Sequence, residues 1–261
     1  MFNRIIYFPH KLGQRKNGVE LAPLIMKHFF NKELASFELE DSNDLFCNLQ
    51  NLYKVNQSFK GKRVNIGGDH SMSIATVAHT FNNFPKSKIL WVDAHADINT
   101  KKSSSTGNLH GMPLASVFNI MEPIIESEYQ QNYDQLIYLG LRDIDDFERK
   151  LLDKKGITYY TTDCIRKTGL NNVLNLVKKS SKNNIHLSFD IDVLDPHLVP
   201  ATGTPVDNGL LLKESSIILN FLKENKNITT FDLVEFNPYL FDVDNRTLRN
   251  SIEIINKIIK I

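Results

Sequence analysis

The 261-residue chain is long enough to form one large α/β domain, since single domains of this class often reach about 200 to 250 residues. Its 31 Lys and Arg residues against 30 Asp and Glu residues leave a net charge of +1, which favours neither nucleic acid nor a membrane surface as a partner. Cys47 and Cys164 lie outside any CxxC pattern, so a disulfide framework or a thiolate metal site is not expected. Without a signal peptide or an apolar run of about 18 residues, the protein is expected in the cytoplasm.

Short apolar runs alternate with segments of helical periodicity from one end of the chain to the other. Strands are expected at 3–8, 64–66, 88–92, 135–140, 157–160, 185–189 and 228–234. Helices are expected from about Val19 onward and at 41–54, 71–81, 146–154, 170–180, 213–224 and 245–261, with loops at 9–18 and 99–111. This alternation predicts a mainly parallel sheet covered by helices on both faces, in a single domain over residues 1–261.

The expected strand at 88–92 leads directly into three side chains that can bind metal, spaced at every second position: Asp93, His95 and Asp97. In an extended chain such side chains point to one side and can converge on one point. For any one of them, a solvated strand end is the simpler interpretation. Three together after an apolar run favour a buried site, and buried carboxylates repel one another unless cations neutralise them.

Two further strand ends carry residues of the same kind. Asp190 and Asp192 follow the run at 185–189, and His70 follows the run at 64–66. Ligands of open α/β sheets bind outside the carboxyl ends of the strands, which is where all of these side chains fall. The sequence therefore predicts one polar site built from several strand ends.

Four carboxylates and two imidazoles can hold two metal ions only if some carboxylates bridge. Asp93 and Asp190 come first after their strands and are the natural bridges. Oxygen-rich ligation with some imidazole suits Mn(II) better than a structural zinc site. Water held between two such ions can be acidified toward a pKa of about 7, so metal-assisted hydrolysis is the predicted reaction class.

Three stretches carry these side chains: GGDH at 67–70, DAHAD at 93–97 and SFDIDVLDP at 188–196. Together they resemble the three metal-binding motifs of the ureohydrolases, a family that includes arginase, agmatinase and formimidoylglutamase. The resemblance covers nearly the whole chain and is strongest to arginase. It implies a three-layer α/β/α fold and two Mn²⁺ ions, one held by His70, Asp93, Asp97 and Asp190 and the other by Asp93, His95, Asp190 and Asp192.

The resemblance to arginase also implies a substrate and the residues that bind it. L-arginine would be hydrolysed to L-ornithine and urea by a hydroxide that bridges the two ions. Neutral groups in the loop at 99–111 would bind the substrate carboxylate, and two acids would hold its ammonium group; Thr204 is a candidate contact to the guanidinium. These expected substrate-binding residues are Asn99, Thr106, Asn108, Asp145, Glu148 and Thr204.

Two more residues carry chemistry in the family. Glu235 would pair with the guanidinium group through two hydrogen bonds, and His110 would serve as proton shuttle or general acid for the leaving amine. Together with Asp97 they are the expected catalytic residues. Thr106 stands where arginases usually have Ser, and Asp207 departs from the family pattern at the pocket rim.

Several alternatives stay open on the sequence alone. Another ureohydrolase would act on agmatine or a different guanidino or formimino compound, and a non-catalytic relative would bind arginine or metal without turnover. A structural module with solvated acids would hold no metal. Members of the family form trimers or hexamers, so a homo-oligomer is an open expectation, because the chain ends at its last helix without the tail that helps to assemble some arginase trimers.

Overall fold

The computed structural model describes residues 2–30, 34–40, 42–180, 184–225 and 228–259. Within these residues, eight parallel strands form one sheet with the order β2-β1-β3-β8-β7-β4-β5-β6. The strands are β1 (Phe2–Phe8), β2 (Ala35–Glu38), β3 (Lys62–Gly67), β4 (Lys88–Val92), β5 (Leu136–Leu141), β6 (Thr158–Thr161), β7 (Ile185–Asp190) and β8 (Ile228–Val234).

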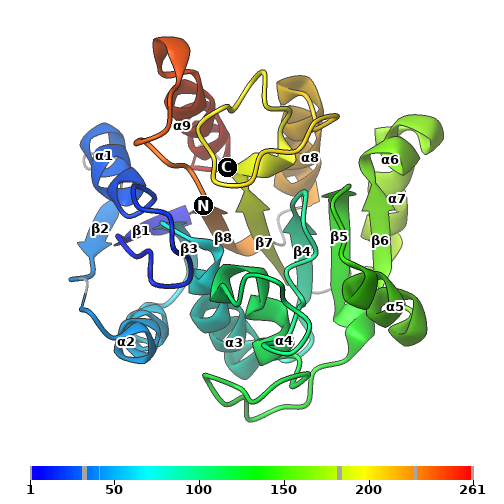
Figure 1. Cartoon of the computed structure of the whole chain (residues 1–261), viewed down its shortest axis with the longest axis horizontal. Coiled ribbons are helices and arrows are strands. Elements are labelled where there is room, and N and C mark those ends of the chain that lie inside the picture. Colours follow the sequence, from blue (N-terminus) through cyan, green and yellow to red (C-terminus); the bar gives the residue numbers. More distant parts are fainter. Residues whose placement is uncertain (1, 31–33, 41, 181–183, 226–227, 260–261) are drawn as a thin grey trace.

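Helices cover both faces of the sheet, which gives three layers (Figure 1). One face packs against α1 (Leu21–Phe30), α6 (Thr162–Thr168), α7 (Leu170–Ser180), α8 (Leu212–Asn225) and α9 (Arg246–Ile259). The other face packs against α2 (Leu45–Ser58), α3 (Ser73–Asn83), α4 (Pro113–Val117) and α5 (Asp146–Lys155). The expected α/β/α architecture is confirmed.

The two apolar layers follow from the alternation of side chains along each strand. In β4, Leu90 and Val92 belong to the core under α8 and α9, whereas Ile89 and Trp91 belong to the core under α3 and α4. A strand buried on both faces reads as a continuous apolar run, which explains why β4 was recognisable from Ile89 to Val92.

The sequence-based boundaries differ from the observed ones in a few places. The short edge strand β2 was missed although Ala35 and Phe37 alternate with Ser36 and Glu38, because four exposed residues give too short a pattern to stand out. Helices α4 and α6 were also missed. Helix α2 starts at Leu45 because the side chain of Asp44 accepts the Cys47 N–H and caps it, whereas Asp41, the expected start, lies outside the described residues. Residues 260–261 of the last expected helix also lie outside them.

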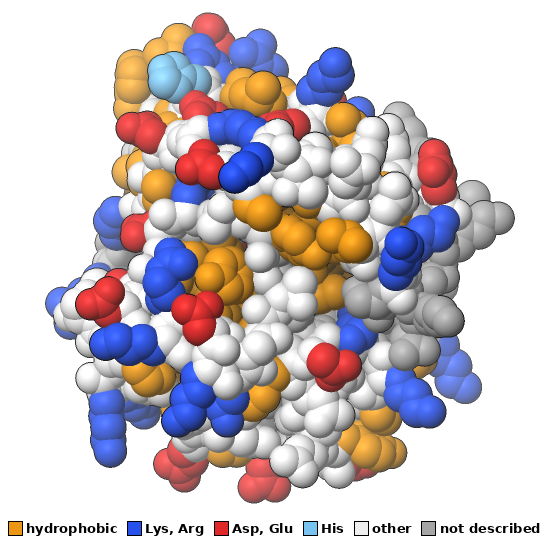
Figure 2. All heavy atoms as spheres, turned by 90° about the vertical axis from the view of Figure 1, so that its right-hand side faces the viewer, with side chains coloured by type: hydrophobic (Ala, Val, Ile, Leu, Met, Phe, Trp, Pro, Cys, Tyr) orange, Lys and Arg blue, Asp and Glu red, His pale blue; other side chains and the backbone are white. Residues whose placement is uncertain are grey.

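The face over α5, α6 and α7 is shown in Figure 2. Basic and acidic side chains are interspersed on it, around small hydrophobic patches. No helix in the described part of the chain is long and apolar enough to cross a membrane.

Candidate active site

Four neighbouring strands, β3, β8, β7 and β4, end at the same edge of the sheet and deliver the predicted polar residues. At three of these ends an aspartate side chain accepts the backbone N–H two residues later: Asp69 from Ser71, Asp93 from His95 and Asp190 from Asp192. Each such bond turns the chain at the strand end. The side chains therefore converge through tight turns, and not through extended chain as the spacing suggested; Asp192 lies in a 3₁₀ turn and Asp97 has a left-handed φ of 51°.

The imidazole of His70 lies at the centre of one group of carboxylates. Its Nδ1 atom is 3.1 Å from Asp93 Oδ2, 3.0 Å from Asp97 Oδ2 and 3.1 Å from Asp190 Oδ2. His70, Asp93 and Asp97 are all buried and can hold one metal ion. These are three of the four ligands expected for the first ion, and the fourth, Asp190, lies beside them.

A second group adjoins the first through Asp93. The Nδ1 atom of His95 is 3.1 Å from Asp192 Oδ2 and 3.6 Å from Asp93 Oδ1, and these three residues can also hold one ion. Asp93 thus presents Oδ2 to the first group and Oδ1 to the second, which is the arrangement a bridging carboxylate needs. Asp190 presents Oδ2 to His70 while its Oδ1 accepts the Asp192 N–H, so its bridging role stays a prediction.

The protonation of these acids reflects crowding of like charges in a buried place. Burial and the neighbouring Asp192 and Asp93 raise the pKa of Asp190 well above its usual value. Burial and Asp93 raise the pKa of Asp97 to about 6. Such groups ionise fully only when positive charge compensates them.

The donor set fits divalent cations. His70 Nδ1 is buried and makes a directional hydrogen bond to none of the three carboxylate oxygens beside it. Separations of about 3 Å between ligand atoms are those of neighbouring positions around an ion with metal–ligand bonds of about 2.1 Å. Four carboxylates with two imidazoles suit hard or borderline divalent ions.

Two residues that hold His70 were missed as site residues. The Nε2 atom of His70 is 2.8 Å from Ser188 Oγ, and its ring stacks on Trp91 with centroids 4.1 Å apart. Donation from Nε2 to Ser188 leaves the lone pair of Nδ1 directed at the acids. Extending the every-second-residue pattern backward from Asp190 and Asp93 would have found both residues.

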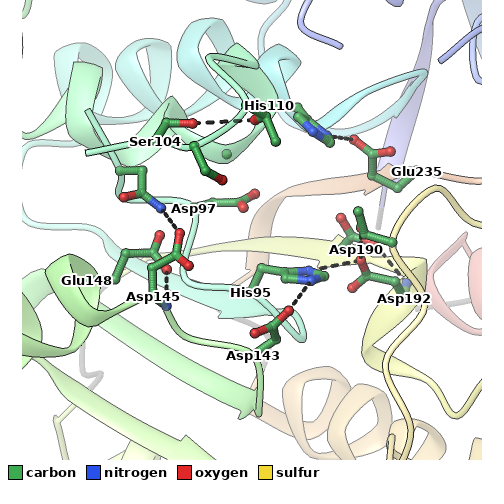
Figure 3. A pocket seen from close by; sticks show the side chains of 15 residues that line it. His95, Asp97, Ser104, His110, Asp143, Asp145, Glu148, Asp190, Asp192 and Glu235 are labelled. Atoms are coloured by element: carbon green, nitrogen blue, oxygen red, sulfur yellow. Dashed lines mark hydrogen bonds and ion pairs between the residues drawn. The ribbon is translucent and has the colours of Figure 1, made fainter. Parts of the chain in front are cut away.

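A cavity of about 190 Å³ opens beside the two groups (Figure 3). Its lining includes His95, Asp97, Asp190 and Asp192 from the ligand groups, and Asn99 and Thr106 from the predicted substrate loop. Asn108 instead lines a neighbouring hollow of about 300 Å³ beside Gln14. The expected carboxylate-binding loop therefore contributes two of its three predicted residues to the cavity, together with Ser104 and Ser105.

Asp145 and Glu148 lie across the cavity from Asp190 and Asp192 (Figure 3). They also form a capping box at the start of α5, so the structural and binding interpretations hold together. Glu148 is buried, and its Oε1 accepts the Ile98 N–H at 3.0 Å. Burial raises the pKa of Glu148 to about 8. Asp145 Oδ2 accepts the Asn99 amide at 2.7 Å, which ties α5 to the substrate loop.

Glu235 and His110 form a pair on the third side of the cavity. His110 Nδ1 lies 3.0 Å from Glu235 Oε1. Burial alone would lower the pKa of His110, but the charge and the hydrogen bond of Glu235 raise it to about 9. Glu235 has a left-handed φ of 67°, held by its N–H bond to Gly68 O at 2.8 Å. Thr204 also lines the cavity and donates to Asp192 Oδ2 at 3.2 Å.

Known proteins resemble this chain in sequence and in fold. The arginase of Bacillus subtilis is 32% identical over 286 residues, covering 98% of this chain and 96% of that protein. A crystal structure of that arginase has a TM-score of 0.89 at 29% identity and covers 99% of this chain and 98% of that one. The Entamoeba histolytica arginase in complex with L-ornithine has a TM-score of 0.87 at 28% identity, covering 100% and 99%.

A protein with a different name, a formimidoylglutamase, also has this fold. The formimidoylglutamase of Bacillus subtilis has a TM-score of 0.84 at 20% identity, over 100% of this chain and 87% of that one, and so shares the fold. The model of the arginase family matches residues 5–260. The chain therefore belongs to the arginase family of dinuclear metal hydrolases.

Proposed function

We propose that this protein is an arginase that hydrolyses L-arginine to L-ornithine and urea with two Mn²⁺ ions. The observation that carries the proposal is the arrangement of three different groups around one small cavity. The acid and imidazole cluster lies on one side, Asp145 and Glu148 on another, and the Glu235 and His110 pair on the third. A substrate with a guanidinium at one end and an ammonium at the other matches the two outlying acidic positions.

The two ions, when bound, supply hydroxide at neutral pH by lowering the pKa of coordinated water toward about 7. Glu235 accepts a guanidinium N–H and so aims the central carbon of the substrate at the cluster, where alignment contributes a large part of the rate. His110 donates through Nδ1 to Glu235, which leaves Nε2 to give a proton to the leaving amine. Its raised pKa keeps the imidazole protonated at neutral pH.

The opposite end of the cavity suits an α-amino acid. Asp145 and Glu148 offer carboxyl oxygens to an ammonium group, and the hydroxyl groups of Ser104, Ser105 and Thr106 offer neutral donors to a carboxylate. Neutral donors are appropriate there because the neighbouring cluster already carries an excess of acids.

One observation favours a second candidate, another ureohydrolase with a different distal group. Asn108 lies outside the cavity, and both oxygens of Glu148 already accept backbone N–H groups, from Ile98 and Asp145. A substrate without an α-carboxylate, such as agmatine, would need fewer contacts in the loop at 99–111.

Urea release separates the two candidates. The protein is assayed with L-arginine and, in parallel, agmatine, after incubation with Mn²⁺ and again with a chelator; Asp93→Ala is the inactive control. Urea from L-arginine that depends on Mn²⁺ is the expected result. Urea from agmatine alone would leave the metal centre in place and overturn the assignment of the carboxylate-binding loop.

A further inference from the structure

Glu235 has more hydrogen-bond donors than its expected role allows. Oε1 accepts the His70 backbone N–H at 2.9 Å and faces His110 Nδ1 at 3.0 Å, while Oε2 accepts Gln14 Nε2 at 2.8 Å. A carboxylate has about four acceptor positions, so three donors leave one open. The expected pairing of Glu235 with guanidinium through two hydrogen bonds is therefore not available while these three donors stay in place.

The donor to Oε2 comes from a distant part of the chain. Gln14 lies 221 residues before Glu235, in the loop at 9–18, and does not line the central cavity. It lines the neighbouring hollow, so Glu235 lies between Gln14 and the substrate cavity. A contact from behind holds the carboxylate without touching the substrate. It also partners a buried charge with a neutral donor, which adds no second charge to the site.

Three contacts around Gln14 fix the loop on the active site. The Gly13 N–H donates to Asp69 Oδ2 at 2.9 Å, and the His110 N–H donates to Gly13 O at 3.0 Å. Two residues further on, Lys16 Nζ donates to Gly203 O. A Cβ atom on Gly13 would collide with the Asp69 carboxylate and the Ser71 hydroxyl, so a residue without a side chain is required for this fit.

We propose that Gln14 is a positioning residue for the reaction, which acts by holding the Glu235 carboxylate with one acceptor position free for the guanidinium group. The loop at 9–18, seated on Asp69, delivers the Gln14 amide to Oε2. The inference rests on the proposed role of Glu235 as the guanidinium acceptor. According to the inference, the orientation of the Glu235 carboxylate is set by a residue outside the cavity.

Two variants of Gln14 test this role, one without a hydrogen-bond donor and one with a second carboxylate. Gln14→Leu removes the donor, and Gln14→Glu keeps the shape but opposes Glu235 with a second carboxylate. A hydrogen bond to a charged group corresponds to roughly a 10- to 100-fold effect, so Gln14→Leu should lower kcat/KM by that factor, mainly through kcat, and Gln14→Glu should lower it further. Gln57→Leu, on the exposed surface of α2, is the matched control and should match the wild type.

Bound metal and melting temperature are measured on the same samples, because a merely structural role would lower them together with activity. Gly13→Ala should shift the seated loop and reproduce the kcat loss of Gln14→Leu with metal still bound. Activity of both Gln14 variants within about twofold of wild type, or Gln14→Glu more active than Gln14→Leu, would overturn the inference.

The wild-type reaction and the ratio of variant to wild type answer different questions. If the wild type hydrolyses agmatine and not L-arginine, the proposed substrate fails and the ratio is measured with agmatine. If it hydrolyses neither, calorimetry with guanidinium chloride replaces turnover, and weaker binding by Gln14→Leu supports the inference. No binding of guanidinium by the wild type would contradict both proposals.

Discussion

Two buried polar groups lie on the same central strands and differ in how their charge is satisfied. In the middle of the sheet, Asp232 on β8 accepts Asn65 Nδ2 at 2.7 Å and Thr76 Oγ1 at 2.5 Å, and lies 2.8 Å from His186 Nε2. At the carboxyl ends of the strands, four carboxylates share two imidazoles. The acids are buried in both places, although the side chain of His95 is 21% exposed.

The difference appears in the proton affinities of Asp232 and Asp190, whereas Asp93, with both imidazoles beside it, has a lowered pKa like Asp232. Burial alone would raise the pKa of Asp232, but His186, Thr76 and Asn65 lower it below its usual value. The pKa of Asp190 is raised well above its usual value by burial and by neighbouring acids. A buried acid is thus no sign of a functional site by itself. The sign is an excess of acids over donors, which either protons or bound cations must balance.

The largest expected effect comes from replacing the acid that joins the two metal groups. Asp93→Asn should lower the urea-forming activity by more than about 100-fold, since even outer residues of a metal site affect it 10- to 100-fold. It should also lose bound metal, because Asp93 presents one oxygen to each group. Metal analysis and urea release check this. The metal-free variant should also lose stability, because both oxygens of Asp93 accept hydrogen bonds, from Trp91 Nε1 and from the His95 N–H, and an amide NH₂ cannot accept one. Full metal binding by Asp93→Asn would contradict the assignment.

The same Asp→Asn substitution at Asp232, in the middle of the sheet, should lower stability without loss of bound metal. Asp232→Asn places an amide NH₂ among donors that need an acceptor, so unfolding in denaturant should show a loss of about 3 kcal/mol. Metal content should stay that of the wild type. A stable Asp232→Asn protein that loses its metal would show that the two groups are not independent.

The sequence predicted one side of this comparison, the candidate metal ligands, and not the group around Asp232. The candidate ligands were recognisable because short motifs place them directly after apolar runs. The contact between Gln14 and Glu235 was not predictable, because it joins two loops 221 residues apart and no local pattern encodes it. Edge strand β2 was not predicted for a different reason: its alternation of apolar and polar residues is only four residues long and fully exposed. Turn geometry was also hidden, since Glu235 adopts a left-handed φ value that its residue type does not favour.

Metal should stabilise the protein only through the acids and imidazoles at the carboxyl ends of the strands, here called the outer group. At a free Mn²⁺ concentration about 100 times the dissociation constant, the unfolding free energy should rise by about 2.7 kcal/mol, because the ion binds the folded state. Thermal or denaturant unfolding with Mn²⁺ and with chelator measures this increment. Asp232→Asn should keep the full increment and Asp93→Asn should lose it; equal increments in all three proteins would place the bound metal elsewhere.

The smallest expected effect is the pH dependence of stability that comes from the buried residue His79. His79 is buried beside Arg63, whose Nη1 lies 3.3 Å from His79 Nε2, and burial followed by the charge of Arg63 lowers the pKa of His79 to about 3. The folded protein therefore holds His79 neutral, while the unfolded chain binds a proton below about pH 6.5. Stability contributed by this residue is present above that pH and is lost as the pH falls toward 3.

Between pH 7 and pH 5 this loss should be about 2 kcal/mol. Denaturant unfolding of the metal-free wild type and of His79→Gln at both pH values isolates it, because the acids of the outer group titrate equally in the two proteins. His79→Gln should lose less stability than the wild type over this interval. Equal losses would show that His79 is solvated enough to titrate in the folded state.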